Sequence, residues 1–374
     1  MKTRRMILTG ILLLCVITIF MPADVSSEER LKLIIDTDMG FDDCSAILYL
    51  LNRPDVEIIA ITVTGAGEVH CQSGIRNVFS LIALANQNPQ SFRVACGDEE
   101  PRDGYHSFPG EWRDSADHFF GEDTLETYPV SSKHAAELII DIIKNSKSPV
   151  TILALGPLTN IADALEQAPT ITANIKRLYI MGGAVEVEGN LKIPGVTDYI
   201  ENTVAEWNIY IDPVAAKLVF HTGIPIYLIP LDATNKVKVT QSRANAFNEL
   251  AKTPETQFIK RQFERENYLI KAGQYYMWDT LSAIATADHE ICGYKSYPLD
   301  VIVEYGKKER KVKGQKFSLL AKNGKPRRAF DAIVSGQTKK SMDGVPIFVC
   351  QKVDVKTLWE KYIQVLNKQY VHSK

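Results

Sequence analysis

The chain has 374 residues, of which 45% are hydrophobic and 24% are charged, and its formal net charge is −2. This balance is typical of a globular protein with a sizeable core. Because the chain carries no basic excess, its composition argues against a nucleic-acid polymer or an anionic membrane surface as a partner of the whole protein.

The N-terminal segment differs from the rest of the chain. Lys2, Arg4 and Arg5 precede the mostly apolar run 7–21, and a polar stretch follows. This is the layout of a secretory signal, so we expect residues 1–27 to be a signal peptide and the protein to be exported to the periplasm or the extracellular space. The alternative is an uncleaved N-terminal anchor, which would attach the protein to a membrane.

After this segment, short β-rich apolar runs alternate with segments of helical spacing. Such alternation predicts an α/β fold, with an open, mostly parallel, Rossmann-like sheet that carries helices on both faces. We expect strands at 31–36, 56–64, 92–96, 150–155, 177–181 and 225–231, and helices at 43–52, 74–86, 133–145, 158–167 and 213–221.

The C-terminal third adds further helices and a hairpin to this sheet. Residues 240–290 have a helical pattern, 298–350 resemble hairpin strands, and 354–368 form a last helix. Since no repeat or long linker interrupts the chain, we expect residues 28–374 to form a single domain. The basic tract 307–316, continued by Arg327 and Arg328, is interpreted as the solvated face of an exposed hairpin rather than a site for an anionic partner.

Five cysteines remain once the N-terminal segment is set aside. They are odd in number, widely spaced and without a CxxC pair, so neither a zinc site nor a dense disulfide framework is predicted. We expect free buried thiols, although an oxidising compartment would allow one disulfide. The five are Cys44, Cys71, Cys96, Cys292 and Cys350.

Four aspartates gather where the first predicted strand ends. Asp36, Asp38, Asp42 and Asp43 lie within eight residues, between two apolar triplets. In parallel sheets, ligands bind beyond the carboxyl ends of the strands. Because like charges this close raise one another's pKa values or require a cation, the cluster predicts a hard, oxygen-liganded ion such as Ca²⁺ or Mg²⁺. The flanking apolar residues argue against the alternative, a single N-cap aspartate with solvated neighbours.

The run D-T-D-x-G-x-D-D at 36–43, followed by a predicted helix, resembles the signature of the inosine–uridine-preferring nucleoside hydrolases. The resemblance extends from about residue 31 to residue 290, and it implies a homo-oligomer, either a dimer or a tetramer. Further segments resemble this family in the same order, at 153–165, 181–183, 189–190, 206–216 and 277–285.

The resemblance implies Ca²⁺ held by the carboxylates of Asp38, Asp43 and Asp279 and by the main-chain carbonyl of Leu155. It also implies that Asp38 is the general base, which takes a proton from a water at the ion. The reaction would cleave the N-glycosidic bond of a ribonucleoside through an oxocarbenium-like sugar and release the free base and ribose.

The remaining roles implied by the resemblance concern the ribose. Asp42 would hold the 2′-hydroxyl group and Asn208 the 2′ and 3′ pair. Asn190 and Glu206 would hold the 5′-hydroxyl group, and Met181 would pack under the sugar. Asp36 would orient the other carboxylates rather than bind the ion.

Two aromatic positions bear on the identity of the base. Many members of the family have a histidine before the last metal aspartate, but here that position is Trp278. A tryptophan there resembles the subgroup that prefers inosine, adenosine and guanosine, where it stacks on the purine; the alternative is core packing. We expect Trp112 to supply a second aromatic side chain for the other face of the base, with Tyr105, His106 and Phe108 as further candidates. The loop that carries them would close over the base as a lid. The alternative is that these residues only pack their loop against the protein.

A second departure from the family pattern lies at 64–71, where many members have an asparagine. Glu68 occupies this region and is expected to contact the base or the ribose, or to orient another residue. His70 is a candidate proton donor for the leaving base, with a structural role as the alternative.

The leading hypothesis is therefore an exported, Ca²⁺-dependent purine nucleoside hydrolase. One alternative is a Mg²⁺-dependent phosphoryl-transfer enzyme with Asp36 as its nucleophile. The others use the same ribose pocket, either as a non-catalytic nucleoside- or ribosyl-binding protein or as a hydrolase of a modified ribosyl compound.

Overall fold

The computed structural model describes residues 30–102, 106–129, 131–304 and 333–369. The predicted signal or anchor at 1–27, Tyr105 and the basic tract with Arg327 and Arg328 lie outside the described residues. Within the described ranges, no helix combines the length and the apolar character needed to cross a membrane.

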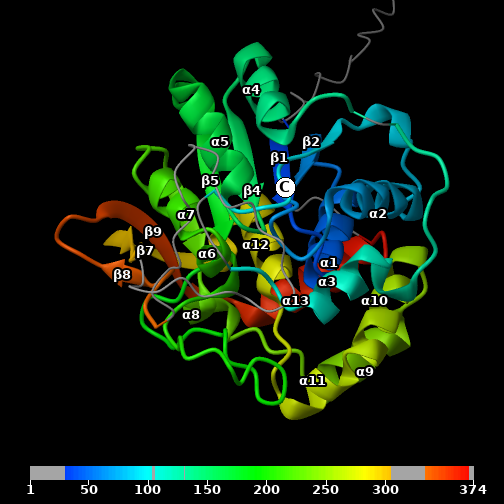
Figure 1. The fold of residues 1–374 in the computed structure, drawn as a ribbon. Coiled ribbons are helices and arrows are strands. Elements are labelled where there is room, and N and C mark those ends of the chain that lie inside the picture. Colours follow the sequence, from blue (N-terminus) through cyan, green and yellow to red (C-terminus); the bar gives the residue numbers. More distant parts are fainter. Residues whose placement is uncertain (1–29, 103–105, 130, 305–332, 370–374) are drawn as a thin grey trace, which may run out of the picture.

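One nine-stranded sheet runs through the molecule (Figure 1). Seven of its strands are parallel and two, β7 and β8, run antiparallel to their neighbours. This architecture confirms the predicted α/β fold. In sheet order the strands are β3 (Val94–Cys96), β2 (Val56–Val63), β1 (Leu31–Thr37), β4 (Val150–Ala154), β5 (Ile175–Met181), β6 (Ile226–Ile229), β9 (Val345–Val353), β7 (Cys292–Val301) and β8 (Thr338–Lys340).

The strand order explains where a ligand would bind. From β1 the chain moves outward to β2 and β3 and then returns to β4 on the other side of β1. The loops after β1 and β4 therefore leave the sheet in opposite directions and open a crevice at the carboxyl ends of these strands.

Helices cover both faces of the sheet. One core lies under α4 (Ala135–Asn145), α5 (Thr159–Gln167) and α7 (Pro213–Phe220). The core on the other face is larger, because the helices of the C-terminal half also pack there. It includes residues of α1 (Phe41–Leu51), α2 (Cys71–Leu84), α9 (Gln241–Leu250), α10 (Pro254–Arg265), α12 (Trp278–Ala287) and α13 (Val355–Leu366).

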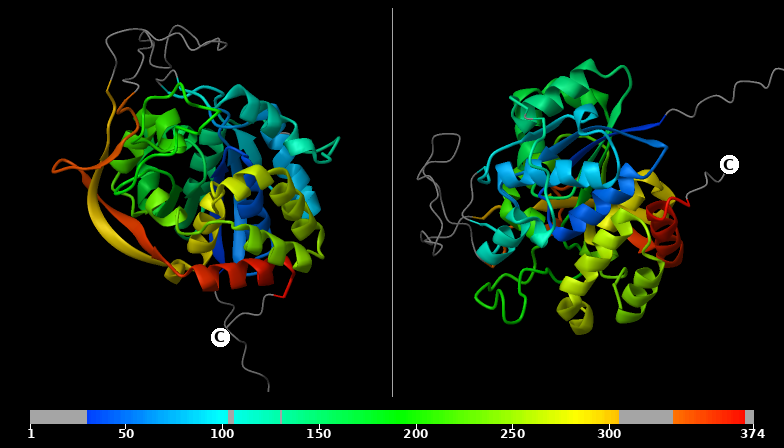
Figure 2. Two further views of the ribbon diagram at one scale, coloured as in Figure 1. Left: turned by 90° about the horizontal axis from the view of Figure 1, so that it is seen from below. Right: turned by 90° about the vertical axis from the view of Figure 1, so that its right-hand side faces the viewer.

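The predicted C-terminal hairpin corresponds to β7 and β9, which pair antiparallel over most of their length and run together along one side of the molecule (Figure 2). β7 begins at Cys292, earlier than the sequence pattern indicates, because residues 292–297 pair with β9 although most of them are not buried.

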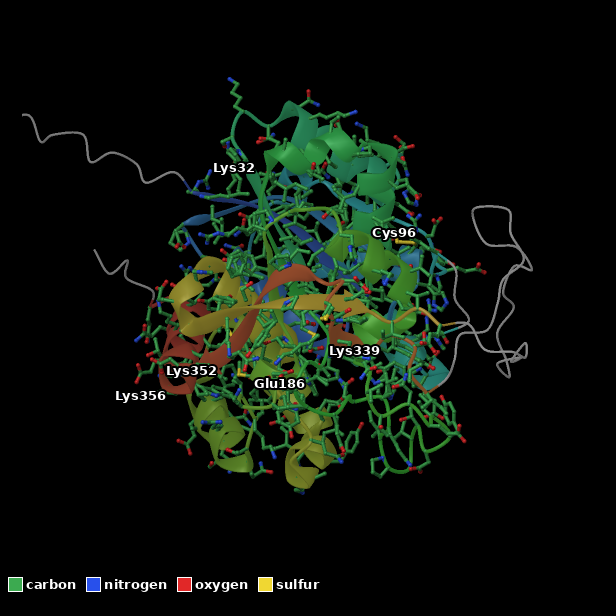
Figure 3. All side chains as sticks on the ribbon, turned by 90° about the vertical axis from the view of Figure 1, so that its left-hand side faces the viewer. Lys32, Cys96, Glu186, Lys339, Lys352 and Lys356 are labelled. Atoms are coloured by element: carbon green, nitrogen blue, oxygen red, sulfur yellow. A yellow bond between two sulfur atoms is a disulfide. The ribbon has the colours of Figure 1, made fainter. Side chains whose placement is uncertain are left out.

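The expectation of free thiols is wrong for four of the five cysteines. Cys71 is disulfide-bonded to Cys96, and Cys292 to Cys350, which leaves Cys44 as the free, buried thiol. The first disulfide joins the start of α2 to the end of β3, where Cys96 is marked in Figure 3, and the second joins β7 to β9. The spacing of the cysteines does not indicate these pairs, because the paired residues are 25 and 58 positions apart in the sequence and come together only in the folded protein.

Candidate active site

A cavity of about 530 Å³ opens at the carboxyl ends of the central strands. It collects residues from distant parts of the chain that the sequence singles out. All twelve predicted site residues line it: Asp38, Asp42, Asp43, Glu68, Trp112, Leu155, Met181, Asn190, Glu206, Asn208, Trp278 and Asp279.

Asp38 sits in a tightly built turn between β1 and α1. The next residue, Met39, is fully buried with φ +57°, a left-handed conformation that costs about 1 kcal/mol or more in a residue with a side chain. A Cβ added at Gly67 would come within 2.1 Å of the Asp38 Cβ, so a glycine is required there. The main-chain N–H of Glu68 then donates to Asp38 Oδ2 at 3.2 Å.

Two helix N-termini bring three further carboxylates together. Asp42 and Asp43 lie in the first turn of α1 and Asp279 in the first turn of α12, where the helix dipole favours negative charge. The two helices pack against each other, so one carboxylate oxygen from each of the three residues lies within 4.8 Å of the others. Asp43 also accepts hydrogen bonds from the Thr37 hydroxyl and from the Gly40 N–H, which fix its orientation.

The carboxylates of this cluster raise one another's pKa values. Burial is the largest cause in each case, and neighbouring negative charges add to it. Burial and the charge of Asp43 raise the pKa of Asp42 to about 7. The pKa values of Asp38, Glu68 and Asp279 are raised well above their usual range by burial and by the other acids. The site therefore carries more negative charge than its own hydrogen bonds stabilise.

The donor set fits a hard divalent cation. The oxygens of Asp42, Asp43 and Asp279 form a compact group, and Asp279 Oδ1 is buried without a hydrogen-bond partner. Calcium takes oxygen ligands of this kind, and a positive charge among them would reverse the pKa shifts. Asp38, predicted as a ligand, is not one of these three, but it lines the same cavity, and after burial the charge of Asp43 is the next cause that raises its pKa.

The carbonyl of Leu155, predicted as a ligand, follows β4 and lines the cavity next to Asn208. It accepts a hydrogen bond from Asn208 Nδ2 at 2.7 Å. A carbonyl oxygen has two lone pairs, so this bond leaves one acceptor position. The same amide also donates to the carbonyl of Met181 at 3.2 Å. Asn208 thus joins the ends of β4 and β5 through its side chain and presents its oxygen for other contacts.

Glu206 and Asn190 are held by main-chain N–H groups. Glu206 is the N-cap of α6 (Trp207–Ile211), and its carboxylate accepts from the N–H groups of Asn208 at 2.9 Å and Gly183 at 3.0 Å. Burial raises the pKa of Glu206 to about 7, and these N–H groups oppose that shift. Asn190 Oδ1 accepts from the Trp207 N–H at 3.2 Å. The two side chains therefore have fixed positions on one side of the cavity.

Asp36 lies beneath the cavity and does not line it. Its side chain is fully buried, and Oδ1 accepts hydrogen bonds from Thr62 at 2.6 Å and from Asn160 at 2.8 Å. Asn160 also donates to the carbonyl of Val63 at 2.9 Å, so one amide joins β1 and β2 to the start of α5. Asp36 is therefore not placed to attack a substrate, which argues against the phosphoryl-transfer alternative.

Two groups of aromatic side chains form walls of the cavity. Trp278 packs against Phe41 and Tyr276, with ring centroids 6.2 and 5.6 Å apart. Trp112 packs against Phe108 and Trp207, with centroids 6.3 and 5.5 Å apart. Each tryptophan thus packs partly on its neighbours and also borders the cavity.

The helix that carries Trp112, α3 (Gly110–Asp117), is firmly attached to its surroundings. Arg113 donates to the carbonyl of Gly65 at 2.8 Å, and Asn77 donates to the carbonyl of Ala116 at 2.7 Å. These bonds join α3 to α2 and to the loop that precedes α2. They argue against the predicted closing of this helix as a lid, because such a motion would break them.

The two histidines considered in the sequence analysis, His70 and His106, do not line the cavity. His70 is half-exposed, and its ring pairs with Asp117 at 2.6 Å. His106 is stacked on Tyr210, with ring centroids 3.7 Å apart, and burial lowers the pKa of His106 to about 3. The structure therefore does not place His70 as a proton donor for a bound base, and His106 contributes packing.

Several cavity residues carry no motif that sequence reasoning could use. Phe41 lies within the D-T-D-x-G-x-D-D run, at a position where the motif allows any residue. The others come from helices and loops whose place on the wall depends on tertiary packing. They include Phe120, Asn235, Glu266, Tyr268, Gln274 and Tyr276.

This geometry can be compared with known proteins. A family model described as "inosine-uridine preferring nucleoside hydrolase" matches residues 33–360. The chain belongs to this family.

Curated relatives are similar over part of their length. The pyrimidine-specific ribonucleoside hydrolase RihA of Klebsiella pneumoniae is 33% identical over 229 residues, which are 59% of this chain and 66% of that protein. Nucleoside hydrolase 3 of Arabidopsis thaliana is 29% identical over 327 residues, which cover 70% of this chain and 36% of that protein. The match thus spans less than two thirds of either relative.

A solved structure shares the fold over nearly the whole chain. The inosine-uridine preferring nucleoside hydrolase from Bacillus anthracis superposes with a TM-score of 0.71 at 24% identity, covering 91% of this chain and all of that one. At this level of identity the likeness concerns the fold alone.

Proposed function

We propose that this protein is a Ca²⁺-dependent N-ribohydrolase that cleaves purine ribonucleosides into free base and ribose. The observation that carries the proposal is the meeting of Asp38 with the Asp42–Asp43–Asp279 group at one end of a cavity with aromatic walls. Family membership supports the reaction type, and the oxygen-only donor set supports the ion.

The residues divide the chemistry between them. Asp38 is the general base that accepts a proton from the attacking water, and its orientation is set by the N–H of Glu68. Bound Ca²⁺ would lower the pKa of a water in its shell, with Asp38, Asp43, Asp279 and the Leu155 carbonyl as its ligands. The surrounding carboxylates stabilise the positive charge that develops on the sugar in the transition state.

The ribose is held by the polar side chains around the cluster. Asp42 binds the 2′-hydroxyl group and Asn208 the 2′ and 3′ pair, while Asn190 and Glu206 bind the 5′-hydroxyl group. Met181 packs under the sugar ring. Each of these side chains lines the cavity, and three of them are already fixed by hydrogen bonds to the main chain.

The preference for purines rests on the tryptophans. Trp278 and Trp112 offer aromatic faces to a base, and a purine has the larger stacking area. The named activity of RihA is directed at pyrimidines, so base preference differs within the set of relatives and needs a direct measurement.

Release of free sugar tests the proposal. The protein is incubated with inosine, uridine or a phosphate ester, with and without a chelator. We expect ribose from inosine faster than from uridine, no phosphate release, loss of activity with the chelator and recovery with Ca²⁺. Tight Ca²⁺ binding without hydrolysis of any nucleoside would contradict the proposal and favour a non-catalytic binding protein.

We further propose that the protein acts outside the cytoplasm. The two disulfides support an oxidising compartment, in agreement with the signal-like segment at 1–27. Cell fractionation with N-terminal sequencing of the native protein tests this. A cytoplasmic protein that retains residues 1–27 would contradict it.

A further inference from the structure

One carboxylate of the cavity has no part in the mechanism above. Glu266 joins α10 to α11 (Asn267–Ala272) and lines the cavity, as do Gln274 and Tyr276. Its main chain is fixed, because its carbonyl accepts the N–H groups of Leu269 at 2.9 Å and Ile270 at 3.1 Å. The main-chain position from which the Glu266 side chain extends is therefore fixed.

Glu266 lines the same cavity as Glu68 and Trp278. Burial is the main cause of the raised pKa values of Glu68 and Tyr275, and the charge of Glu266 adds to both. The ring of Tyr275 lies 6.0 Å from that of Trp278. Glu266 therefore borders the cavity into which a base stacked on Trp278 would project, and its charge acts on the Glu68 and Tyr275 side chains.

The bonding of this carboxylate leaves it able to accept more hydrogen bonds. Burial raises the pKa of Glu266 and the neighbouring Tyr268 hydroxyl opposes that shift, and a carboxylate that is ionised can accept about four hydrogen bonds. A partly buried carboxylate that faces a cavity is best matched by a ligand that brings N–H donors, because charged acceptors form the stronger hydrogen bonds.

We propose that Glu266 is a specificity-determining residue that accepts hydrogen bonds from the base and favours bases with two adjacent N–H donors, as guanine has at its ring nitrogen and its 2-amino group. This inference rests on the proposed function, which assigns the base to this cavity. Hypoxanthine offers only the ring N–H at the same edge. Guanosine and inosine therefore differ by the one group that the second carboxylate oxygen would bind.

The test compares guanosine with inosine in three proteins: the unaltered chain, Glu266→Gln and Glu264→Gln. Glu264 is an exposed residue of α10 that does not line the cavity, so it is a matched control. We expect the unaltered protein to favour guanosine over inosine in kcat/KM. In Glu266→Gln, one acceptor oxygen becomes a donor, so kcat/KM for guanosine should fall by roughly tenfold or more, and the ratio should approach one. Glu264→Gln should keep the original ratio.

Calorimetry with guanine and hypoxanthine makes the test independent of turnover. We expect guanine to bind more tightly than hypoxanthine, and Glu266→Gln to remove the difference. A guanosine-to-inosine ratio and a guanine affinity that are both unchanged in Glu266→Gln would overturn the inference while leaving the hydrolase activity intact. If no nucleoside is hydrolysed, the proposed function fails, and base binding still decides the role of Glu266.

Discussion

The two ends of the cavity are built in opposite ways. At the proposed metal end, Asp38, Asp43 and Asp279 are at most 3% exposed and are carried by elements that pack on the central strands. At the outer wall, Trp112 is carried by the short helix α3 and Glu266 by the junction of α10 and α11, and Tyr268 at the start of α11 is 62% exposed. The first region depends on the sheet, and the second on side-chain contacts between helices.

We expect the two regions to have different roles: the proposed metal end acts in the reaction, and the outer wall acts in recognition of the base. The proposed metal end forms the floor of the cavity. It is fixed by main-chain hydrogen bonds, such as the one from the Leu155 N–H to the Asp36 carbonyl at 2.8 Å. The wall is joined by contacts such as the ring pair Phe119 and Phe258, 5.5 Å apart, which links the segment after α3 to α10 (Figure 1). Changes in the wall should therefore alter the choice of base, whereas changes in the floor should alter turnover for every base.

The largest effect is expected from Asp38→Asn. The amide keeps the shape of the side chain but cannot take a proton, so kcat should fall by about 10³-fold or more for all nucleosides. Ribose affinity, measured by calorimetry, should change much less. Asp343→Asn, at an exposed aspartate, is the control. Retention of more than a tenth of the activity in Asp38→Asn would exclude Asp38 as the base.

Trp278→Ala should alter the preference for the base, because it changes only the aromatic wall of the cavity. Loss of stacking of roughly 1–3 kcal/mol corresponds to about 5- to 150-fold in kcat/KM for inosine, with a smaller loss for uridine. The ratio of the two substrates, measured by ribose release, reports the change. An unchanged ratio would assign Trp278 to packing with Phe41 and Tyr276 instead.

Asn160→Ala should affect the floor without touching the substrate. It removes the hydrogen bonds to Asp36 and to the Val63 carbonyl, so the loops that carry Asp38 and Glu68 lose a common support. We expect kcat to fall by about tenfold and Ca²⁺ to bind more weakly, with the inosine-to-uridine ratio unchanged. Asn174→Ala, whose amide bonds to Ile143 far along the chain, is the control. A shifted substrate ratio would contradict the separation of the two regions.

The smallest effect concerns stability and pH. Burial raises the pKa values of Asp36 and Asp42 to about 7 from about 3.8, so the folded state binds more protons than the unfolded state between these values. Without metal, the free energy of unfolding should therefore decrease as the pH rises from 4 to 7. Saturating Ca²⁺ should raise the melting temperature at pH 7 by several degrees. A chelated protein that becomes more stable over this range would contradict the charge crowding described here.

The proposed metal end was predictable from the sequence because two of its residues directly follow strands. Asp38 and Leu155 come directly after the apolar runs of β1 and β4, and parallel strands bring their carboxyl ends to one edge of the sheet. The order of the family motifs then extended the prediction to Asn208 and Asp279, which also line the cavity.

The outer wall was not predictable to the same extent. Glu266 and Tyr268 lie in a helical segment of ordinary composition, and their place beside Trp278 results from how α10 and α11 pack. Whether His70 is a proton donor or structural could not be decided from the sequence for a similar reason, since its pairing with Asp117 depends on the position of α3. Such contacts join segments whose sequence patterns carry no information about one another.

The disulfides affect how the protein should be prepared. By loop-closure entropy they would contribute roughly 3 and 4 kcal/mol for loops of 25 and 58 residues. Cys71 follows Glu68 by three residues, so we expect thiol reductants in a purification buffer to remove one support of the segment whose N–H bonds to Asp38, the proposed general base. Recombinant protein from a reducing cytosol would lack both cross-links, and specific activity should then be compared between oxidised and reduced preparations before any variant is interpreted.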